Sequence, residues 1–282
     1  MTMDPMATFQ TTDGTNLFYT EWGAGTPVVF AHSWGLNSDM WNYQVPDLVD
    51  AGCRCIVYDR RGQGRSELVG HGYDCDTLAR DLAALIEKLD LRGVTLVAHS
   101  FGAMEAVWYV SRHGSGRVAQ VVLLAPTTPY LLKTDDNPQG ADRAFFEATA
   151  AALRRDVGRW CTDNAPRFFG ADTWVSSATL DWTLRMIVDT PLQVLLDTWW
   201  TNVETDCRED LRRLPVPTLV LHGDADASAP LEVTGRPTAD LLPDGELRVY
   251  PNTGHGLYVS EHDRVNADVL AFMRNEATSR SA

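Results

Sequence analysis

Val97-Ala98-His99-Ser100-Phe101-Gly102 is the stretch of sequence that decides the interpretation of this chain. It places a serine between a strand-like apolar run and a helical pattern. The small residues Ala98 and Gly102 suit a sharp turn in which the strand and helix backbones nearly touch. A helix beginning at Phe101 would aim its amide groups at the Ser100 hydroxyl. Ser100 is therefore a candidate nucleophile, with a helix N-cap as its alternative role.

Other apolar runs of strand length occur along the chain, at Val28–Ala31, Cys55–Tyr58, Val94–Val97, Val121–Leu124 and Thr218–Leu221. Runs that are apolar throughout suit a parallel sheet that is buried on both faces. Between two of these runs, leucines in residues 77–89 form a single helical stripe. The alternation predicts an α/β fold with a mostly parallel central sheet flanked by helices.

The strand and helix alternation stops between residues 127 and 207, where the sequence becomes helical and aromatic. We expect an α/β core formed by residues 1–126 and 208–282, with residues 127–207 inserted as a helical lid. An apolar face is predicted where Leu192, Leu195, Leu196 and Trp199 recur at helical spacing. Most lid aromatics are expected to pack as helical core. Some should line an apolar substrate pocket, and the candidates are Trp160, Trp182, Trp199 and Trp200.

Composition excludes several classes of partner. The formal net charge of −14 opposes binding to nucleic acid or to an anionic membrane surface. No apolar run approaches the roughly 18 residues of a membrane span, and the sequence does not begin with a signal-peptide pattern, so a cytoplasmic location is expected. The five cysteines show neither C-x-x-C pairs nor zinc-site spacing, which predicts reduced structural thiols and no metal site. A homo-oligomer is compatible with the sequence, which does not determine the oligomeric state.

A serine hydroxyl becomes a good nucleophile when a histidine held by a carboxylate takes its proton. His255 lies between two glycines in a loop after the strand-like residues 247–250, where such a base is expected. The other six histidines are better explained by structure. His32 and His99 adjoin the two turns, and His222 ends a strand. His71, His113 and His262 lie in polar surroundings and are expected to be solvated. Of the two aspartates after the run ending at Leu221, Asp224 suits a turn former, so we favour Asp226 as the acid.

A backbone N–H from the loop after the first long apolar run usually completes an oxyanion hole. That loop is His32-Ser33-Trp34-Gly35, so Trp34 and Phe101 are the expected N–H donors. The Trp34 indole is then free to wall the acyl pocket, unless it is simply a core residue. The loop 59–66 is rich in glycine and arginine but lacks the Gly-Lys-Ser/Thr ending of a phosphate-binding loop. A tight turn with an arginine paired to a carboxylate is the preferred interpretation.

From about Thr8 to Met273 the chain resembles the α/β-hydrolases called non-haem (cofactor-free) haloperoxidases. This group includes bacterial aryl esterases, perhydrolases and γ-lactamases. The motifs that carry the resemblance are Asp39–Trp41, Asp59–Ser66, Val94–Val97 with the serine turn, Pro215–Asp226 and Gly254–Gly256. The resemblance implies an α/β-hydrolase fold with Ser100, Asp226 and His255 as catalytic residues and the amides of Trp34 and Phe101 as oxyanion donors. It implies no metal and no organic cofactor.

Four positions depart from the pattern of the group. Ser33, Ala98 and Ala103 stand where relatives usually have glycine, and Gly35 stands where many perhydrolase-like relatives have proline. An added Cβ in either turn narrows the space around the backbone and the acyl group. These departures favour ester hydrolysis over peracid formation.

The sequence thus predicts a serine hydrolase that cleaves a small, neutral, hydrophobic carboxylic ester or lactone through an acyl-enzyme. The alternative is a perhydrolase, or cofactor-free haloperoxidase, that uses the same residues to make peracids from hydrogen peroxide. A non-catalytic ligand-binding protein on the same fold is a third hypothesis, and the complete set of three catalytic residues argues against it.

Overall fold

The computed structural model describes residues 7–170 and 174–279. These residues form an eight-stranded sheet in the order β1-β2-β4-β3-β5-β6-β7-β8. The strands β4, β3, β5, β6, β7 and β8 run parallel to their neighbours in that order, which confirms the predicted mostly parallel sheet. The strand bounds are β1 Ala7–Gln10, β2 Asn16–Gly23, β3 Thr26–Ala31, β4 Cys53–Tyr58, β5 Val94–His99, β6 Val118–Leu124, β7 Thr218–Gly223 and β8 Gly245–Tyr250.

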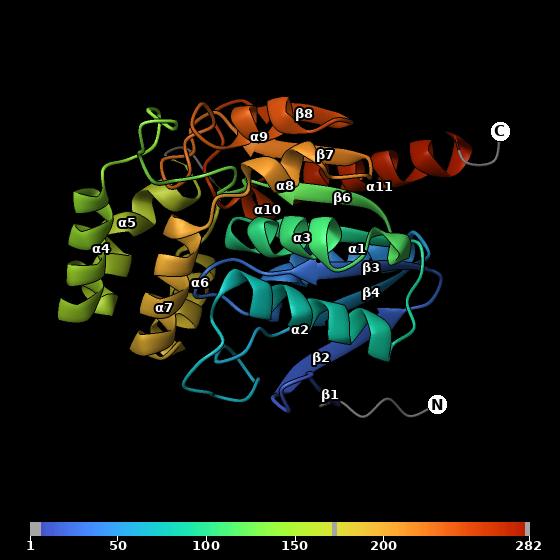
Figure 1. Ribbon diagram of the computed structural model, residues 1–282, viewed down its shortest axis with the longest axis horizontal. Helices are drawn as coiled ribbons and strands as arrows, with labels where there is room; N and C mark the ends of the chain where they lie inside the picture. The colour runs from blue at the N-terminus through green and yellow to red at the C-terminus, as the bar shows by residue number, and fades with distance from the viewer. Residues whose placement is uncertain (1–6, 171–173, 280–282) are drawn as a thin grey trace.

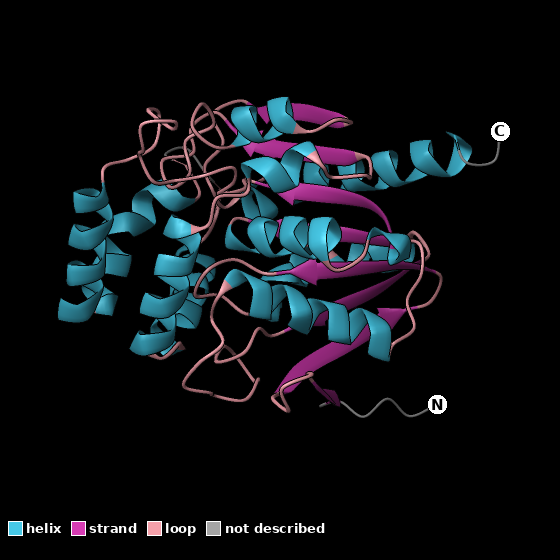
Figure 2. Cartoon of the chain, viewed as in Figure 1, coloured by secondary structure: helices cyan, strands magenta, loops and turns pink. Residues whose placement is uncertain are grey.

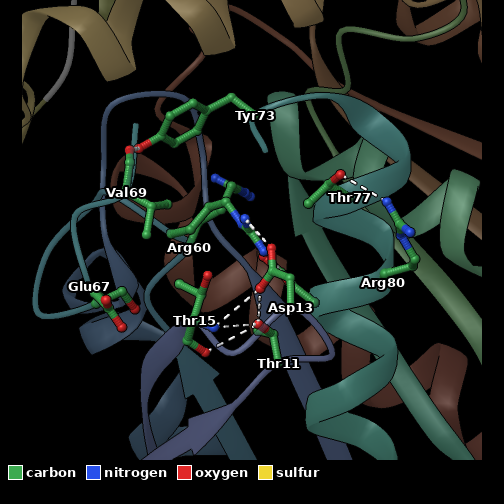
Figure 3. Close-up of polar contacts among 12 residues, drawn as sticks. Thr11, Asp13, Thr15, Arg60, Glu67, Val69, Tyr73, Thr77 and Arg80 are labelled. Atoms are coloured by element: carbon green, nitrogen blue, oxygen red, sulfur yellow. Dashed lines mark hydrogen bonds and ion pairs between the residues drawn. The ribbon is translucent and has the colours of Figure 1, made fainter. Parts of the chain in front are cut away.

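Two strands at one edge of the sheet, β1 and β2, were not predicted from the sequence. β2 pairs antiparallel with both β1 and β4, and its outer residues are partly exposed, so it lacks a continuous apolar run. The turn between β1 and β2 contains Asp13 and Gly14, a hairpin signal, and Gly14 has the positive φ that such a turn favours. The Asp13 carboxylate accepts hydrogen bonds from the Thr11 hydroxyl and the Thr15 N–H, which close the turn (Figure 3).

Helices cover both faces of the sheet. α2, α3, α8 and α9 lie on one face, whereas α1, α10 and α11 lie on the other (Figure 1). The helix bounds are η1 Ser38–Tyr43, α1 Val45–Asp50, α2 Cys75–Lys88, α3 Phe101–Arg112, η2 Ser115–Arg117, α4 Arg143–Arg155, α5 Val157–Phe168, α6 Ser177–Asp189, α7 Leu192–Glu204, α8 Arg208–Arg212, α9 Gly235–Leu241, α10 Leu257–Ser260 and α11 His262–Ser279.

The leucine stripe predicted in residues 77–89 is the buried face of α2. Asp74 caps this helix, since its carboxylate accepts a hydrogen bond of 2.9 Å from the Thr77 N–H. The buried face includes Leu78, Leu82 and Leu85, which pack into the core. Local capping and the apolar stripe therefore agree on where the helix begins and how it faces.

Helices α4–α7 follow β6 in the chain and precede β7, inside the segment that we interpret as a lid. They gather at the side toward which the parallel strands point, as the arrowheads show (Figure 2). In an open parallel sheet this carboxyl end is where ligands bind. The division into core and lid stays a prediction, but the helices lie where a lid would cover a site.

The predicted apolar face of α7 is correct only in part. Leu195 and Leu196 are buried, whereas Leu192 is 36% exposed and Trp199 is half-buried. The polar residue Thr198 is fully buried, because its hydroxyl donates to the Val194 carbonyl at 2.6 Å within the helix. The apolar spacing could not reveal this internally satisfied threonine. Among the described residues, no helix is long and apolar enough to cross a membrane.

Candidate active site

Ser100 lies at the sharp turn between β5 and α3. Its φ of +54° and ψ of −117° are strained for a residue with a side chain. The turn is held because the Ser100 N–H donates to the Leu124 carbonyl at 3.0 Å. A Cβ at Gly102 would meet the carbonyl oxygen of Ala31, so the small residue expected there is needed. Ser100 makes no side-chain capping bond, which removes the N-cap alternative.

The structure brings Ser100, His255 and Asp226 together. Nε2 of His255 lies 2.9 Å from the Ser100 Oγ, and its Nδ1 lies 2.7 Å from Oδ2 of Asp226. A carboxylate can only accept, so Nδ1 carries the ring proton and Nε2 is left to accept from the serine hydroxyl. Ser100 is 5% exposed and His255 4%, so the relay is largely shielded from water.

Asp226 is a buried carboxylate, and all of its hydrogen-bond partners are N–H donors. Its Oδ1 accepts the N–H groups of Ser228 and Ala229, each at 2.8 Å, and its Oδ2 faces both His255 and His222. Burial raises the pKa of Asp226, but the charge of His255 and the hydrogen bonds from the two histidines outweigh burial and lower it. The carboxylate therefore stays ionised beside the imidazole of His255.

Asp224 stands apart from the relay. Its side chain is exposed, and Oδ1 accepts the Asn252 N–H at 2.6 Å, so it binds the distant loop after β8 and not, as expected, the backbone amides of its own turn. Among the other histidines, His32 and His99 are buried against the two turns, while His113 pairs with Asp76. Within the described ranges, no group of three or more His, Cys, Asp or Glu side chains is placed to hold a metal ion.

His222 has a contact that the sequence analysis did not anticipate. It was expected merely to end a strand, yet its Nε2 lies 3.1 Å from Oδ2 of Asp226 and 2.8 Å from the Ala229 carbonyl. A signal was present, since His222 lies at the end of β7 and stands four residues before Asp226. The contact between His222 and Asp226 depends on the turn after β7, which folds Asp226 back toward the strand.

The expected oxyanion donors lie on the two turns that flank the serine. Among the described residues, the backbone N–H groups of Trp34 and Phe101 have no hydrogen-bond partner in the protein. Buried backbone donors are nearly always paired, so two free ones beside a serine are suited to bind a ligand oxygen. Phe101 is also the first residue of α3, where the helix dipole favours negative charge.

The Trp34 side chain connects the candidate oxyanion loop to the lid helices. Its indole N–H donates to the Leu195 carbonyl of α7 at 3.0 Å, and its ring has edge contacts with Trp160 and Trp199. A second bond joins the same segments, because the Thr190 hydroxyl donates to the Gly35 carbonyl at 3.1 Å. Trp34 is thus a contact between the core and α7.

The four predicted pocket tryptophans do not form one group. Trp160 and Trp199 contact the Trp34 ring, next to the candidate oxyanion amide. Trp200 instead lies beneath the Arg143 guanidinium of α4. Trp182 lines a surface hollow that it shares with Asn42, Tyr43, Ala178 and Thr179, and none of the candidate catalytic residues lines it. Pocket lining by any of the four stays a prediction.

The Arg-rich loop 59–66 contains the paired arginines favoured by the sequence interpretation. Arg61 makes two bonds to the Asp81 carboxylate, at 2.6 and 2.7 Å, and Arg65 contacts Asp59 at 2.8 Å. The cysteines are all buried and free of disulfides, as expected of structural thiols. Among the described residues, the Arg61 and Arg65 pairs and the cysteines make no hydrogen bond with Ser100, His255 or Asp226.

Comparison with known proteins agrees with this fold. Residues 26–261 match the family model described as the alpha/beta hydrolase fold. The chain therefore belongs to the α/β-hydrolase family.

Within this family, the predicted resemblance to the non-haem haloperoxidases is confirmed. The chain is 41% identical to the non-heme chloroperoxidase CPO-A1 of Kitasatospora aureofaciens, over 93% of this chain and 98% of the relative. It is 34% identical to the bifunctional esterase/perhydrolase of Acinetobacter calcoaceticus, over 94% and 98% of the two chains. The crystal structure of a bromoperoxidase from Bacillus anthracis superposes with a TM-score of 0.91 at 34% identity, covering 95% of this chain and 99% of that one.

Proposed function

We propose that this α/β-hydrolase is a serine hydrolase that cleaves a small, neutral, hydrophobic carboxylic ester or lactone. The observation that carries the proposal is the continuous contact from Ser100 Oγ through His255 to Asp226, at 2.9 and 2.7 Å. Ser100 attacks the carbonyl carbon while His255 accepts its proton. Asp226 holds the ring and stabilises the imidazolium without taking the proton itself.

The negative oxygen formed in this step is bound by the N–H groups of Trp34 and Phe101. A donor that meets charge developing in the transition state is worth about 3 kcal/mol of barrier. His255 then gives its proton to the leaving alcohol, and an acyl group remains on Ser100. Water, activated by the same histidine, hydrolyses the acyl-enzyme and restores the serine. No step needs a metal or an organic cofactor.

The hydrophobic substrate class is supported by the surroundings of the site. Trp34, Trp160 and Trp199 form an aromatic group beside the candidate oxyanion amide. An aromatic wall favours an apolar acyl group, and the formal net charge of −14 disfavours an anionic substrate. A cytoplasmic location and a homo-oligomer stay predictions that these contacts do not address.

The test is pre-steady-state kinetics with a p-nitrophenyl ester. We expect a burst of p-nitrophenol equal to the enzyme concentration, followed by slower turnover. Ser100→Ala should remove the burst and lower kcat at least about a thousandfold. Ser111→Ala is the matched control, because it removes a hydroxyl from the same helix without touching the relay. Full activity of Ser100→Ala would contradict the proposal, and tight binding of intact ester by the wild type would favour a ligand-binding protein.

A second candidate function is perhydrolysis, in which hydrogen peroxide replaces water in attacking the acyl-enzyme and releases a peracid. It is favoured by the relatives, one of which is named an esterase/perhydrolase and another a chloroperoxidase. Against it, Gly35 adopts a φ of +66°. The φ angle of proline is locked near −65°, so a relative with proline at this position cannot share the backbone conformation of Gly35.

The two functions are separated by one comparison. The enzyme is incubated with acetate and hydrogen peroxide, and peracetic acid is measured against hydrolysis of an acetate ester at the same enzyme concentration. A panel of aryl esters, alkyl esters and lactones then defines the acyl and alcohol preference. Ester hydrolysis without peracid supports the first candidate, and a peracid rate that exceeds ester hydrolysis supports the second.

A further inference from the structure

We infer that Arg60 and His32 are positioning residues that orient the Ser33–Trp34 peptide, so that the Trp34 N–H faces the oxyanion. The inference rests on the proposed function, because it concerns the oxyanion formed when Ser100 attacks an ester. Neither side chain touches the substrate. Both act through the backbone of the loop between β3 and η1.

One peptide unit contains both groups that matter for this orientation. The Ser33 carbonyl and the Trp34 N–H belong to the same peptide bond, which is trans. In a trans peptide these two groups point in opposite directions, so fixing the carbonyl also fixes the N–H. The carbonyl of Ser33 accepts a hydrogen bond from Nδ1 of His32 at 2.8 Å. It accepts a second, longer one from Nη1 of Arg60 at 3.5 Å. A flip of this peptide would break both contacts in a dry interior.

His32 is held in the one tautomer that can do this. Its Nε2 accepts the Arg60 backbone N–H at 2.9 Å, so the ring proton must lie on Nδ1, which donates to the Ser33 carbonyl. Burial and then the nearby Arg60 charge lower the pKa of His32 well below its usual range, and the ring stays neutral. The loop is therefore anchored by a hydrogen bond that does not vary across neutral pH.

Arg60 connects the two candidate oxyanion donors. Its Nη2 donates to the His32 carbonyl at 2.8 Å, on the Trp34 side. Its Nε donates to Glu105 at 2.8 Å, and Glu105 lies on α3, the helix that begins with Phe101. The guanidinium also lies 4.9 Å from the centre of the Phe101 ring. One fully buried side chain thus sets the position of the first donor relative to the second.

A buried ion pair could serve stability alone, and Arg61 provides the comparison. The next residue in the chain is also fully buried and is paired with Asp81 and Asp13, but it makes no hydrogen bond or ion pair with residues 32–35. Figure 3 shows the Asp13 side of this second network, in the hairpin turn far along the chain from Ser100. Arg61→Lys therefore damages a buried ion pair without disturbing the oxyanion loop, and is the matched control.

The variants are chosen to separate orientation from folding. Arg60→Lys keeps the positive charge but loses the planar guanidinium, whose separate N–H groups bond His32 and Glu105 at the same time. His32→Leu removes the donor to the Ser33 carbonyl, whereas His32→Asn keeps an amide donor near the Nδ1 position. Each folded variant is assayed with a p-nitrophenyl ester and with the matching thionoester. Sulfur accepts hydrogen bonds weakly, so the preference for the oxygen ester reports on oxyanion binding.

For Arg60→Lys and His32→Leu, we expect kcat to fall about tenfold to a hundredfold, with KM within about twofold. The preference for the oxygen ester over the thionoester should shrink by a similar factor. His32→Asn should retain most of both quantities, and Arg61→Lys should retain both even if its unfolding midpoint falls. Binding of an aryl trifluoromethyl ketone, which forms a tetrahedral adduct with the serine, should weaken in parallel with kcat/KM.

Folded Arg60→Lys and His32→Leu enzymes with wild-type kcat and ester preference would overturn the inference. If Arg60→Lys does not fold, the His32→Leu and His32→Asn pair decides, because equal losses in both would overturn it as well. Failure of the proposed function has a different signature. In that case Ser100→Ala would keep its activity, and the wild type would show no burst.

Discussion

His222 and His255 contact the same oxygen, Oδ2 of Asp226, at 3.1 and 2.7 Å. Both partners of His222 Nε2 are acceptors, namely this carboxylate and the Ala229 carbonyl, so Nε2 carries a proton and donates. Gly235 packs directly against the other side of the His222 ring, where a Cβ would meet Nδ1. The candidate acid is therefore held between two imidazoles, of which only one reaches Ser100.

His222→Leu is expected to lower kcat/KM about tenfold, because a hydrogen bond to a charged group contributes about 1.5–3 kcal/mol and part of this is shared with Ala229. His222→Gln can place an amide donor near the same carboxylate and should lose less. Steady-state kinetics on a single ester measures both. His113→Leu, which changes a histidine remote from the relay, should leave kcat/KM unchanged. Equal activity of His222→Leu and wild type would contradict a role for this residue.

Ser100 sits at a positive φ that only glycine adopts without strain, so its position costs stability. Ser100→Gly should therefore be more stable than Ser100→Ala by about 1 kcal/mol, after allowing for the greater flexibility of glycine in the unfolded chain. Both variants lack the hydroxyl, so their difference reports on the backbone. Urea unfolding gives the two free energies. A less stable glycine variant would show that the turn is not strained.

Gly102→Ala should destabilise the fold by roughly 2 kcal/mol, because the added methyl group meets the carbonyl oxygens of Ala31 and His32. The same displacement would move the oxyanion loop, so kcat should fall as well. Gly116→Ala is the control, since a Cβ there has no atom within 4 Å, and its stability should be unchanged or slightly higher. Unfolding curves and ester kinetics of both variants test this, and equal stabilities would count against a close approach of α3 to β3.

Two buried histidines predict how stability depends on pH. Burial lowers the pKa of both His32 and His99 well below 6.5, with the Arg60 charge and the His255 charge as the next causes. Below pH 6.5 the unfolded chain binds protons that the folded chain does not. The free energy of unfolding should therefore fall as pH decreases through 6.5, with a slope that approaches about 1.4 kcal/mol per pH unit for each histidine once the pH is well below 6.5.

This dependence is measured by urea unfolding between pH 7.5 and 5.5. In His99→Gln the total fall in the free energy of unfolding between pH 7.5 and 5.5 should be smaller by about 1.4 kcal/mol, because one of the two buried groups no longer titrates in the unfolded chain. His71 is exposed, so His71→Gln should keep the wild-type slope. An unchanged slope in His99→Gln would mean that His99 titrates normally in the folded protein.

The buried centre of the sheet was predictable from sequence, whereas its edge was not. Every residue of β5 and β7 is buried, so their apolar runs are continuous. β2 is partly exposed and antiparallel, and only the Asp13-Gly14 turn signalled it. On α7 the predicted apolar face was wrong at Leu192, which is exposed. Apolar spacing also gave no sign that Thr198 is buried, because a side-chain to backbone bond satisfies its hydroxyl.

For the candidate site, spacing and turn chemistry were enough to propose Ser100 and His255, but they only slightly favoured Asp226 over Asp224 before the family resemblance was considered. The supporting contacts were not predictable, because they join residues far apart in the chain. Arg60 meets Glu105 across 45 positions, and only the pairing of β4, β3 and β5 brings the loop after β4 beside α3. A histidine that binds a carboxylate looks the same in sequence as one that ends a strand.

Trp34 has one role through its backbone and another through its side chain, and protein engineers usually try to alter such roles separately. Its backbone N–H is the proposed oxyanion donor, while its indole N–H holds α7 through the Leu195 carbonyl. A substitution that enlarges the acyl pocket at this position would also release α7 from the loop that is proposed to stabilise the transition state. Laboratory evolution toward bulkier esters should therefore find its gains at Trp160 or Trp199, whose rings border Trp34 but whose backbones take no part in the reaction.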